Sequence, residues 1–268
     1  MRGRLATAVA LTALLALVAG CDGGDDPTTA ATAAPPTVTG MPVTTAPPAT
    51  APPPASPPAT GLLPDLPAPA DDGQARLPGA STVEDGLGGA PAIAPEVQRA
   101  AQAADCQVRA FESQGRNHLP ADADFRYSTE PPTSGDHYAI WADWGVYEAP
   151  VPAPVQVHNL EHGGVIVHVG ADVPAGLRRE IGALWAASPP YMLVMPGAGA
   201  SFPPAGVVVT SWQRWLVCRT SSAEALPAIE AFRDAYRGRG PEGAAGLNAP
   251  VPNDFPGMPE PVARDPGA

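Results

Sequence analysis

The sequence predicts an α+β fold, in which a small and mainly antiparallel sheet carries helices on one face and is preceded by a long disordered tether. Beyond about residue 97, β-branched runs alternate with amphipathic stretches in the order β-α-β-β-α, as expected when helices cover a sheet. A ferredoxin-like arrangement is one candidate. Before that point Pro, Ala and Thr dominate, and such chain cannot bury enough apolar surface to fold.

The elements follow from residue type and spacing. Stretches with apolar residues at helical spacing predict three helices: 97–107, 174–186 and 222–236. Runs rich in β-branched or apolar residues predict three strands: 165–169, 191–195 and 207–212. Residues 214–218 either continue the third strand or pair back with it. Residues 117–157 read as loop-rich, with a strong turn signal at 131–135.

Composition divides the chain of 268 residues into four parts. These are a signal peptide (1–20), a lipid anchor with the tether (21–96), a single globular domain (97–247) and a disordered Pro-rich tail (248–268). All five His, all five Trp and all five Tyr lie in the third part. We expect one folded domain, because the Pro-rich parts cannot form a core.

The N-terminus indicates export. Arg2 and Arg4 precede an apolar run that ends at Ala19, which is short for a membrane span but typical of a signal peptide. Its end, Leu17 to Cys21, resembles the lipobox of bacterial lipoproteins. The resemblance implies acyl chains such as palmitate on Cys21 and a place on the outer face of the cell membrane. An ordinary secretory signal is the alternative.

Charge limits the classes of partner, and cysteine content predicts a disulfide. The formal net charge is −12, and no basic stripe is present beyond the short group of Arg233, Arg237 and Arg239, so we expect no nucleic-acid binding. With Cys21 lipidated, Cys106 and Cys218 remain. An exported protein usually pairs such cysteines, which predicts a disulfide. Two separate thiols, or a cysteine that ligates a soft metal, are the alternatives.

The five histidines lie close together in the sequence: His118, His137, His158, His162 and His168. His158 and His162 share a face whether their segment is a helix or a strand, and Glu161 joins them only on a helix. Neutral imidazoles ligate Zn²⁺ or Cu²⁺. We therefore interpret His118, His137, His158 and His162 as candidate metal ligands, with Glu161 orienting a ligand or acting in acid–base chemistry. A purely structural cluster is the alternative.

A second candidate site is the aromatic loop of Trp141, Trp144 and Tyr147. Its rings either cover the core or present a recognition surface to a partner. Such a partner would be a component of the cell wall or another envelope protein.

Longer motifs are similar to an uncharacterised bacterial family, domain of unknown function 3105. They are Asn117 to Leu119, Pro131 to Tyr138, Trp144 to Tyr147, Val157 to Gly164 and Ala235 to Glu242. The resemblance covers about residues 104 to 243. It implies an exported or membrane-attached protein with histidines at the positions of His118, His137, His158 and His162, and it carries no established activity.

Three functions therefore stay open. The first is a non-enzymatic envelope lipoprotein that binds a transition metal. The second is an interaction module that uses the aromatic loop. The third is a hydrolase that uses Glu161 and His162 as an acid–base pair; it lacks the His-Glu-x-x-His zincin pattern.

Overall fold

The computed structural model describes residues 61–63, 66–68, 89–120, 123–242, 255 and 257–266. The predicted signal peptide and Cys21 lie outside the described residues, as does most of the predicted tether. Among the described residues, no helix is long and apolar enough to cross a membrane.

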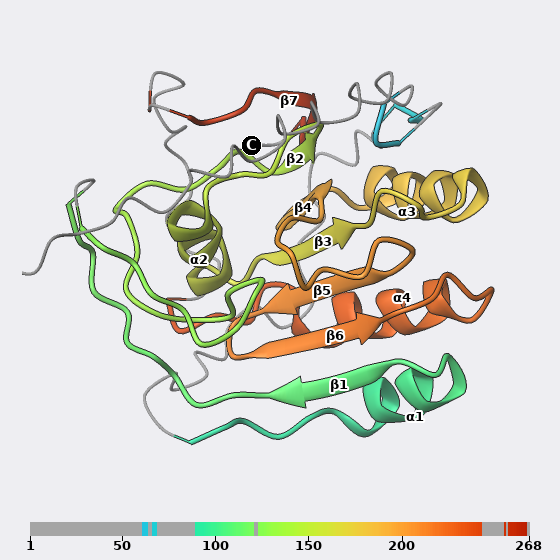
Figure 1. The fold of residues 1–268 in the computed structure, drawn as a ribbon, viewed down its shortest axis with the longest axis horizontal. Coiled ribbons are helices and arrows are strands. Elements are labelled where there is room, and N and C mark those ends of the chain that lie inside the picture. The colour runs from blue at the N-terminus through green and yellow to red at the C-terminus, as the bar shows by residue number, and fades with distance from the viewer. Residues whose placement is uncertain are drawn as a thin grey trace, which may run out of the picture. The chain divides into compact units, whose positions relative to one another are not determined.

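A seven-stranded mixed sheet organises the described part of the chain, in the order β1-β6-β5-β3-β4-β2-β7 (Figure 1). Its strands are β1 (Gln107–Ala110), β2 (Gly145–Tyr147), β3 (Val165–Val169), β4 (Met192–Pro196), β5 (Val207–Ser211), β6 (Arg214–Cys218) and β7 (Pro261–Arg264). Most neighbours are antiparallel, which confirms the predicted α+β class, but β4 pairs in parallel with both β2 and β3.

The ferredoxin-like arrangement is wrong. In that fold the two strands joined by a crossover helix are separated by a third strand. Here β3 and β4, which are joined by a helix, are direct parallel neighbours. Of the two alternatives stated for residues 214–218, the structure has the second: β5 pairs antiparallel with β6 through the turn at Trp212 and Gln213. Gln213 adopts a positive φ of 59°, as tight hairpin turns require.

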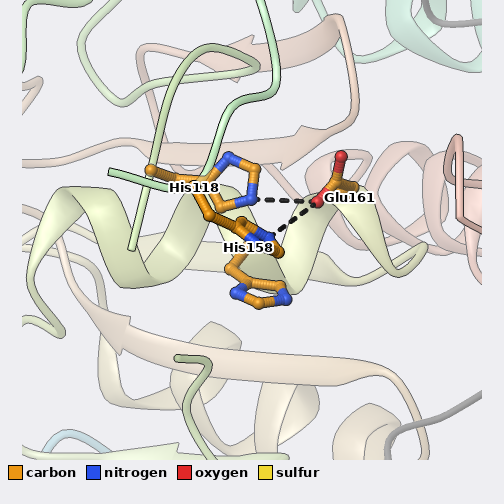
Figure 2. A group of neighbouring side chains, drawn as sticks. His118, His158 and Glu161 are labelled. Carbon is orange, nitrogen blue, oxygen red and sulfur yellow. Dashed lines mark ion pairs between the residues drawn. The ribbon is translucent and has the colours of Figure 1, made fainter. Parts of the chain in front are cut away.

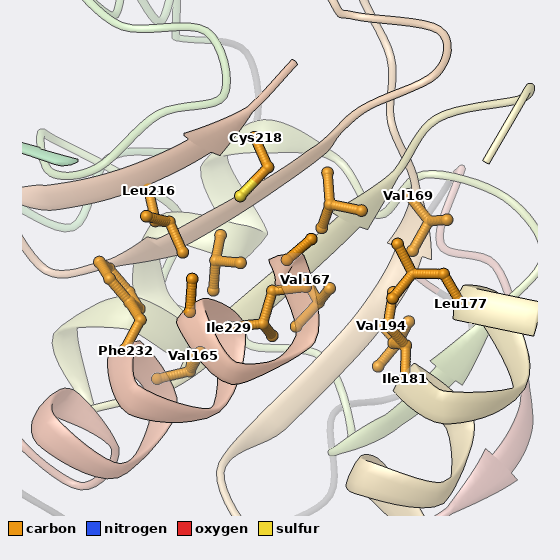
Figure 3. Packing of buried hydrophobic residues seen from close by; sticks show 14 of the residues in the cluster. Val165, Val167, Val169, Leu177, Ile181, Val194, Leu216, Cys218, Ile229 and Phe232 are labelled. Atoms are coloured by element: carbon orange, nitrogen blue, oxygen red, sulfur yellow. The ribbon is translucent and has the colours of Figure 1, made fainter. Parts of the chain in front are cut away.

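Helices cover both faces of the sheet, not one face as predicted. The four described helices are α1 (Pro95–Ala103), α2 (Ala153–Glu161), α3 (Ala175–Ala187) and α4 (Ala225–Tyr236). Alternate strand residues explain the two layers. Val165, Val167 and Val169 pack with α1, α3 and α4, whereas Ile166 faces α2 and the aromatic loop. Figure 3 shows the first of these layers, with Ile181 of α3 and Ile229 of α4 directed at the strands.

The connections between the parallel strands explain why helices lie on both faces. The chain runs from β2 through α2 to β3, passing over β4, and then returns through α3 to β4. Because the two crossovers run in opposite directions across the sheet and keep one hand, they must lie on opposite faces. The carboxyl ends of β2, β3 and β4 therefore meet at one edge.

Two predicted boundaries differ from the structure. The tail from residue 248 was expected to be disordered, but β7 pairs antiparallel with β2. Gly145 permits this pairing, because a Cβ there would stand 2.3 Å from the Ala263 carbonyl oxygen. Within the predicted tether, Leu62 and Leu63 are buried in the core, and Arg178 donates a hydrogen bond to the Leu62 carbonyl. Backbone pairing with β2 explains the first difference, and apolar side chains that reach the core explain the second.

A disulfide joins Cys106 to Cys218, across 112 residues of sequence and a Cα–Cα distance of 4.4 Å. Cys106 directly precedes edge strand β1, and Cys218 ends its neighbour β6. The bond therefore fastens one edge of the sheet at the point where β1 enters it.

Candidate functional site

Helix α2 carries the centre of the candidate site. It begins after its N-cap Pro152, with Pro154 in the first turn, where the missing N–H removes no helical hydrogen bond, and it ends at Glu161 with His162 as its C-cap. Gly163 follows with a φ of +84°, the left-handed conformation that terminates many helices. Every residue from Val155 to Glu161 is buried. The polar side chains of the last helical turn must therefore find partners inside the protein.

Four side chains converge at this end of α2: His118, His137, His158 and Glu161. One ligand atom from each lies within 4.8 Å of all the others. We call this group the His/Glu cluster. Figure 2 labels His118, His158 and Glu161 and marks the ion pairs that His118 Nε2 and His137 Nε2 make with the Glu161 carboxylate.

Backbone pairing brings the two loop histidines together. His118 and His137 form an isolated β-bridge, in which the Leu119 amide donates to the His137 carbonyl and the His137 amide donates to the Asn117 carbonyl. Asp136 supports the bridge by accepting hydrogen bonds from the Asn117 backbone and side chain. The Thr133–Asp136 turn thus places His137 beside α2, while His118 closes the cluster from outside.

Hydrogen bonds to carbonyl oxygens set the direction of two imidazoles. His137 Nδ1 lies 2.8 Å from the Gly135 carbonyl oxygen, and His158 Nδ1 lies 2.7 Å from the Tyr138 carbonyl oxygen. Because a carbonyl only accepts, Nδ1 carries the proton in each ring. In the neutral rings Nε2 then presents a lone pair, and this is the arrangement by which proteins orient metal-binding histidines.

Glu161 lies in an unusual environment for a carboxylate. Its side chain is 1% exposed, and it sits at the C-terminus of α2, where the helix dipole is negative. Burial alone would raise the pKa of Glu161, but the close approach of His137 and the charges of His158 and His118 hold it below its usual value. The neighbouring histidines therefore more than offset the effect of burial on the pKa of Glu161.

The contact between Glu161 and His137 is incomplete as a hydrogen bond. Glu161 Oε2 and His137 Nε2 are 2.9 Å apart. Yet among the described residues neither this nitrogen nor either Glu161 oxygen has a hydrogen-bond partner of suitable geometry. Burial, opposed only in part by the bond to the Tyr138 carbonyl, also lowers the pKa of His158 to about 4, so this ring is neutral at pH 7. Three buried electron-pair donors thus point into one space.

His162 lies beside the cluster and takes a different place from the one predicted. Its Nε2 is 3.0 Å from His158 Nε2 and 3.6 Å from a Glu242 oxygen. The two rings share a face of α2, as their spacing predicts, but the compact group contains Glu161 in place of His162. Glu161 belongs to the cluster because its segment is a helix, and only on a helix does it share a face with the histidines.

A short closing segment, residues 238–242, holds the end of α2 from the other side. The Gly238 amide donates to the Gly163 carbonyl, and the Glu242 amide donates to the Glu161 carbonyl. A Cβ on Gly240 would stand 2.0 Å from the Glu161 carbonyl oxygen, so only glycine permits this contact. Sequence reasoning did not place these residues at the site, although the Gly-rich motif at 238–242 was visible.

The remaining sequence-predicted residues lie outside the cluster. His168, on β3, is buried 3.4 Å from Thr210 Oγ1, and burial lowers its pKa to about 3. Trp144 and Tyr147 are buried core residues, which agrees with the first of the two alternatives stated for the aromatic loop. Trp144 packs under Gly164 and against Tyr191. Of the three aromatic-loop residues, only Trp141 is half-buried, and its ring centroid lies 5.2 Å from that of His158.

Access to the cluster is narrow. Glu161 and His137 are fully buried and His162 is nearly so, whereas the His118 side chain is 44% exposed. Such sealed contacts oppose a hydrolase that brings Glu161 and His162 against a bulky substrate. Three imidazole nitrogens and one carboxylate oxygen are instead a donor set suited to borderline transition-metal ions.

Comparisons with known proteins agree with the resemblance seen in the motifs. Residues 118–247 match the family model described as Protein of unknown function (DUF3105), and the matched region includes all four cluster residues. Neither the curated proteins nor the solved structures that were compared gave a match.

Proposed function

We propose that the folded domain binds a transition-metal ion, Zn²⁺ or Cu²⁺, through His118, His137, His158 and Glu161. The observation that carries the proposal is the convergence of four ligand atoms in one place. Of these groups, the buried His137 Nε2 and both Glu161 oxygens have no hydrogen-bond partner among the described residues, while backbone carbonyls fix Nδ1 of His137 and of His158. A divalent cation would meet every one of these donors and would neutralise Glu161 at the negative end of α2.

Zn²⁺ and Cu²⁺ suit this donor set better than Mg²⁺ or Ca²⁺ do. Imidazole nitrogen binds Zn and Cu, whereas Mg²⁺ and Ca²⁺ prefer oxygen ligands alone. Four protein ligands would fill a tetrahedral shell and leave no open position, as in structural zinc sites. The ion would then tie the loops that carry His118 and His137 to helix α2.

The proposed location is the outer face of the cell membrane. It rests on the signal-like N-terminus and the lipobox-like residues before Cys21, which would hold the domain by a lipid at the end of the Pro-rich tether. An envelope site would meet metal ions from outside the cell, and the disulfide suits such an oxidising compartment.

Metal content and metal-dependent stability test the proposal. The purified full chain is stripped with EDTA, reloaded with ZnCl₂ or CuCl₂, and analysed for bound metal and melting temperature. His118→Ala is the variant of choice, because this ligand is half-exposed and its loss leaves the buried packing intact. His168→Gln is the matched control, since it removes a buried histidine outside the cluster.

Copper adds a local readout. The Trp141 ring lies 5.2 Å from the His158 ring, so bound Cu²⁺ should quench its fluorescence. We expect about one equivalent of metal in the parent chain and in His168→Gln, and affinity at least about tenfold weaker in His118→Ala. Absence of bound metal and an unchanged melting temperature with both ions would refute the proposal, since a ligand of the native state must stabilise it.

A further inference from the structure

A cavity of about 270 Å³ lies on the α2 face of the sheet, apart from the His/Glu cluster. Its wall is formed largely by proline rings, among them Pro150, Pro152 and Pro196. His168 and Gln156 add polar groups to its lining, and both residues are more than nine-tenths buried. Glu130 and Ala198 also line it and are exposed.

The cavity lies where the three parallel strands end. Pro150 and Pro152 follow β2, His168 lies one residue before the end of β3, and Pro196 ends β4. The cavity is therefore at the carboxyl ends of the three parallel strands. Their two crossover helices, α2 and α3, leave this edge toward opposite faces of the sheet. In open α/β sheets, ligands bind in the crevice at such a switch point.

We propose that this cavity is a binding site for a small, uncharged ring compound that carries an N–H donor, such as a lactam. The Gln156 amide donates to the Val151 carbonyl through Nε2, and its Oε1 has no hydrogen-bond partner among the described residues. Glu130 supplies a second acceptor at the rim. The unpartnered Gln156 oxygen and the exposed Glu130 carboxylate both accept hydrogen bonds, so the matching ligand must donate.

Charge and shape narrow the class further. No Arg or Lys lines the cavity among the described residues, and Glu130 contributes a negative charge, so phosphates and carboxylates are disfavoured. Proline rings present C–H surfaces and no backbone N–H, which favours a compact apolar body. The volume is below the usual range of about 300–1,000 Å³ for drug-sized ligands, so the compound must be small.

This site is independent of the proposed metal site. The cavity is lined by residues at the N-terminal end of α2, and the cluster gathers at its C-terminal end. One site can therefore fail in experiment while the other stands.

Ligand-observed saturation-transfer NMR on the purified full chain tests the proposal, with 2-piperidone as the probe. N-Methyl-2-piperidone lacks the donor, and cyclohexanecarboxylate tests an anion of similar size. Ala198→Phe fills the mouth of the cavity from an exposed position, and Ala183→Phe makes the same change at an exposed position of α3. Pro150→Trp closes the rim independently in case Ala198→Phe does not fold.

We expect 2-piperidone to bind the parent chain and Ala183→Phe equally well. The N-methyl compound and either mouth variant should weaken binding by at least about tenfold, and the anion should not bind. The proposal is overturned if 2-piperidone does not bind, if the N-methyl compound binds as well, or if both folded mouth variants retain full affinity.

Discussion

Replacing Glu161 by Gln separates a metal site from a buried ion pair. The change keeps the size of a fully buried side chain and removes only its charge. If Glu161 serves a protonated His137, its loss leaves an unpaired buried cation and should cost about 3–5 kcal/mol even in EDTA. If instead the cluster imidazoles are neutral and await a metal ion, a Gln amide can donate to their lone pairs, where a carboxylate can only accept. Glu161→Gln should then match or exceed the parent stability in EDTA.

The metal-loaded state gives the magnitude. A metal at 100 times its dissociation constant stabilises the parent chain by about 2.7 kcal/mol. Loss of one charged ligand of four should weaken metal affinity about 100-fold. This is the upper end of the loss of affinity seen when a residue that only hydrogen-bonds to a metal ligand is removed. At the same metal concentration the variant would gain only about 0.4 kcal/mol. At about 2–4 °C per kcal/mol, the parent melting temperature rises by about 5–11 °C and that of the variant by about 1–2 °C.

Thermal melts followed by circular dichroism, with and without metal, measure both effects. Glu242→Gln is the control, because this carboxylate lies 3.6 Å from His162 and outside the cluster. It should keep the full metal response. The reasoning is refuted if Glu161→Gln is severely destabilised in EDTA, or if its melting temperature rises with metal as much as the parent's does.

Three further predictions concern other parts of the fold. Cys106→Ala should lower the free energy of unfolding by about 2–5 kcal/mol, and a reductant should lower that of the parent alike but leave the variant unchanged. His168→Gln should flatten the acid side of the stability–pH curve. The unfolded chain binds a proton at His168 below about pH 6.5, because that is the ordinary pKa of histidine, but the folded chain does so only near pH 3. The free energy of unfolding of the parent therefore falls by up to about 1.4 kcal/mol per pH unit as the pH drops between these values. Identical slopes of parent and variant on the acid side would contradict this. Gly240→Ala should cost about 1–3 kcal/mol and weaken metal binding, because its Cβ collides with the Glu161 carbonyl; unaltered melting and metal affinity would show that the closing segment yields freely.

Local patterns were sufficient for the middle of the sheet. Strands β3 and β4 and helices α3 and α4 lie where β-branched runs and helical spacing predict them. Helix α2 escaped prediction because its polar and apolar residues from Val155 to Glu161 are buried alike and do not divide into an exposed and a buried face. Strands β2 and β7 are three and four residues long, too short for any pattern, and they exist because each finds a neighbour.

The site could be predicted only where a local spacing rule applied. The spacing of His158 and His162 requires a shared face, and this arrangement is present. No spacing rule links His118 to His137, because their meeting depends on a two-residue bridge between loops. The inclusion of Glu161 depended on the helix, which the sequence left undecided.

The strand order also constrains how the protein can be assembled as it leaves a ribosome or a membrane channel. Edge strand β1 is made early, yet β6, its one partner among the described strands, follows about a hundred residues later. The opposite edge of the described sheet is completed by β7, which is later still in the sequence. Until β6 arrives, the Cys106 thiol has no native partner, and Cys21 is the one other cysteine already synthesised. Acylation of Cys21 would remove that competitor and leave Cys218 as the sole thiol with which Cys106 can pair.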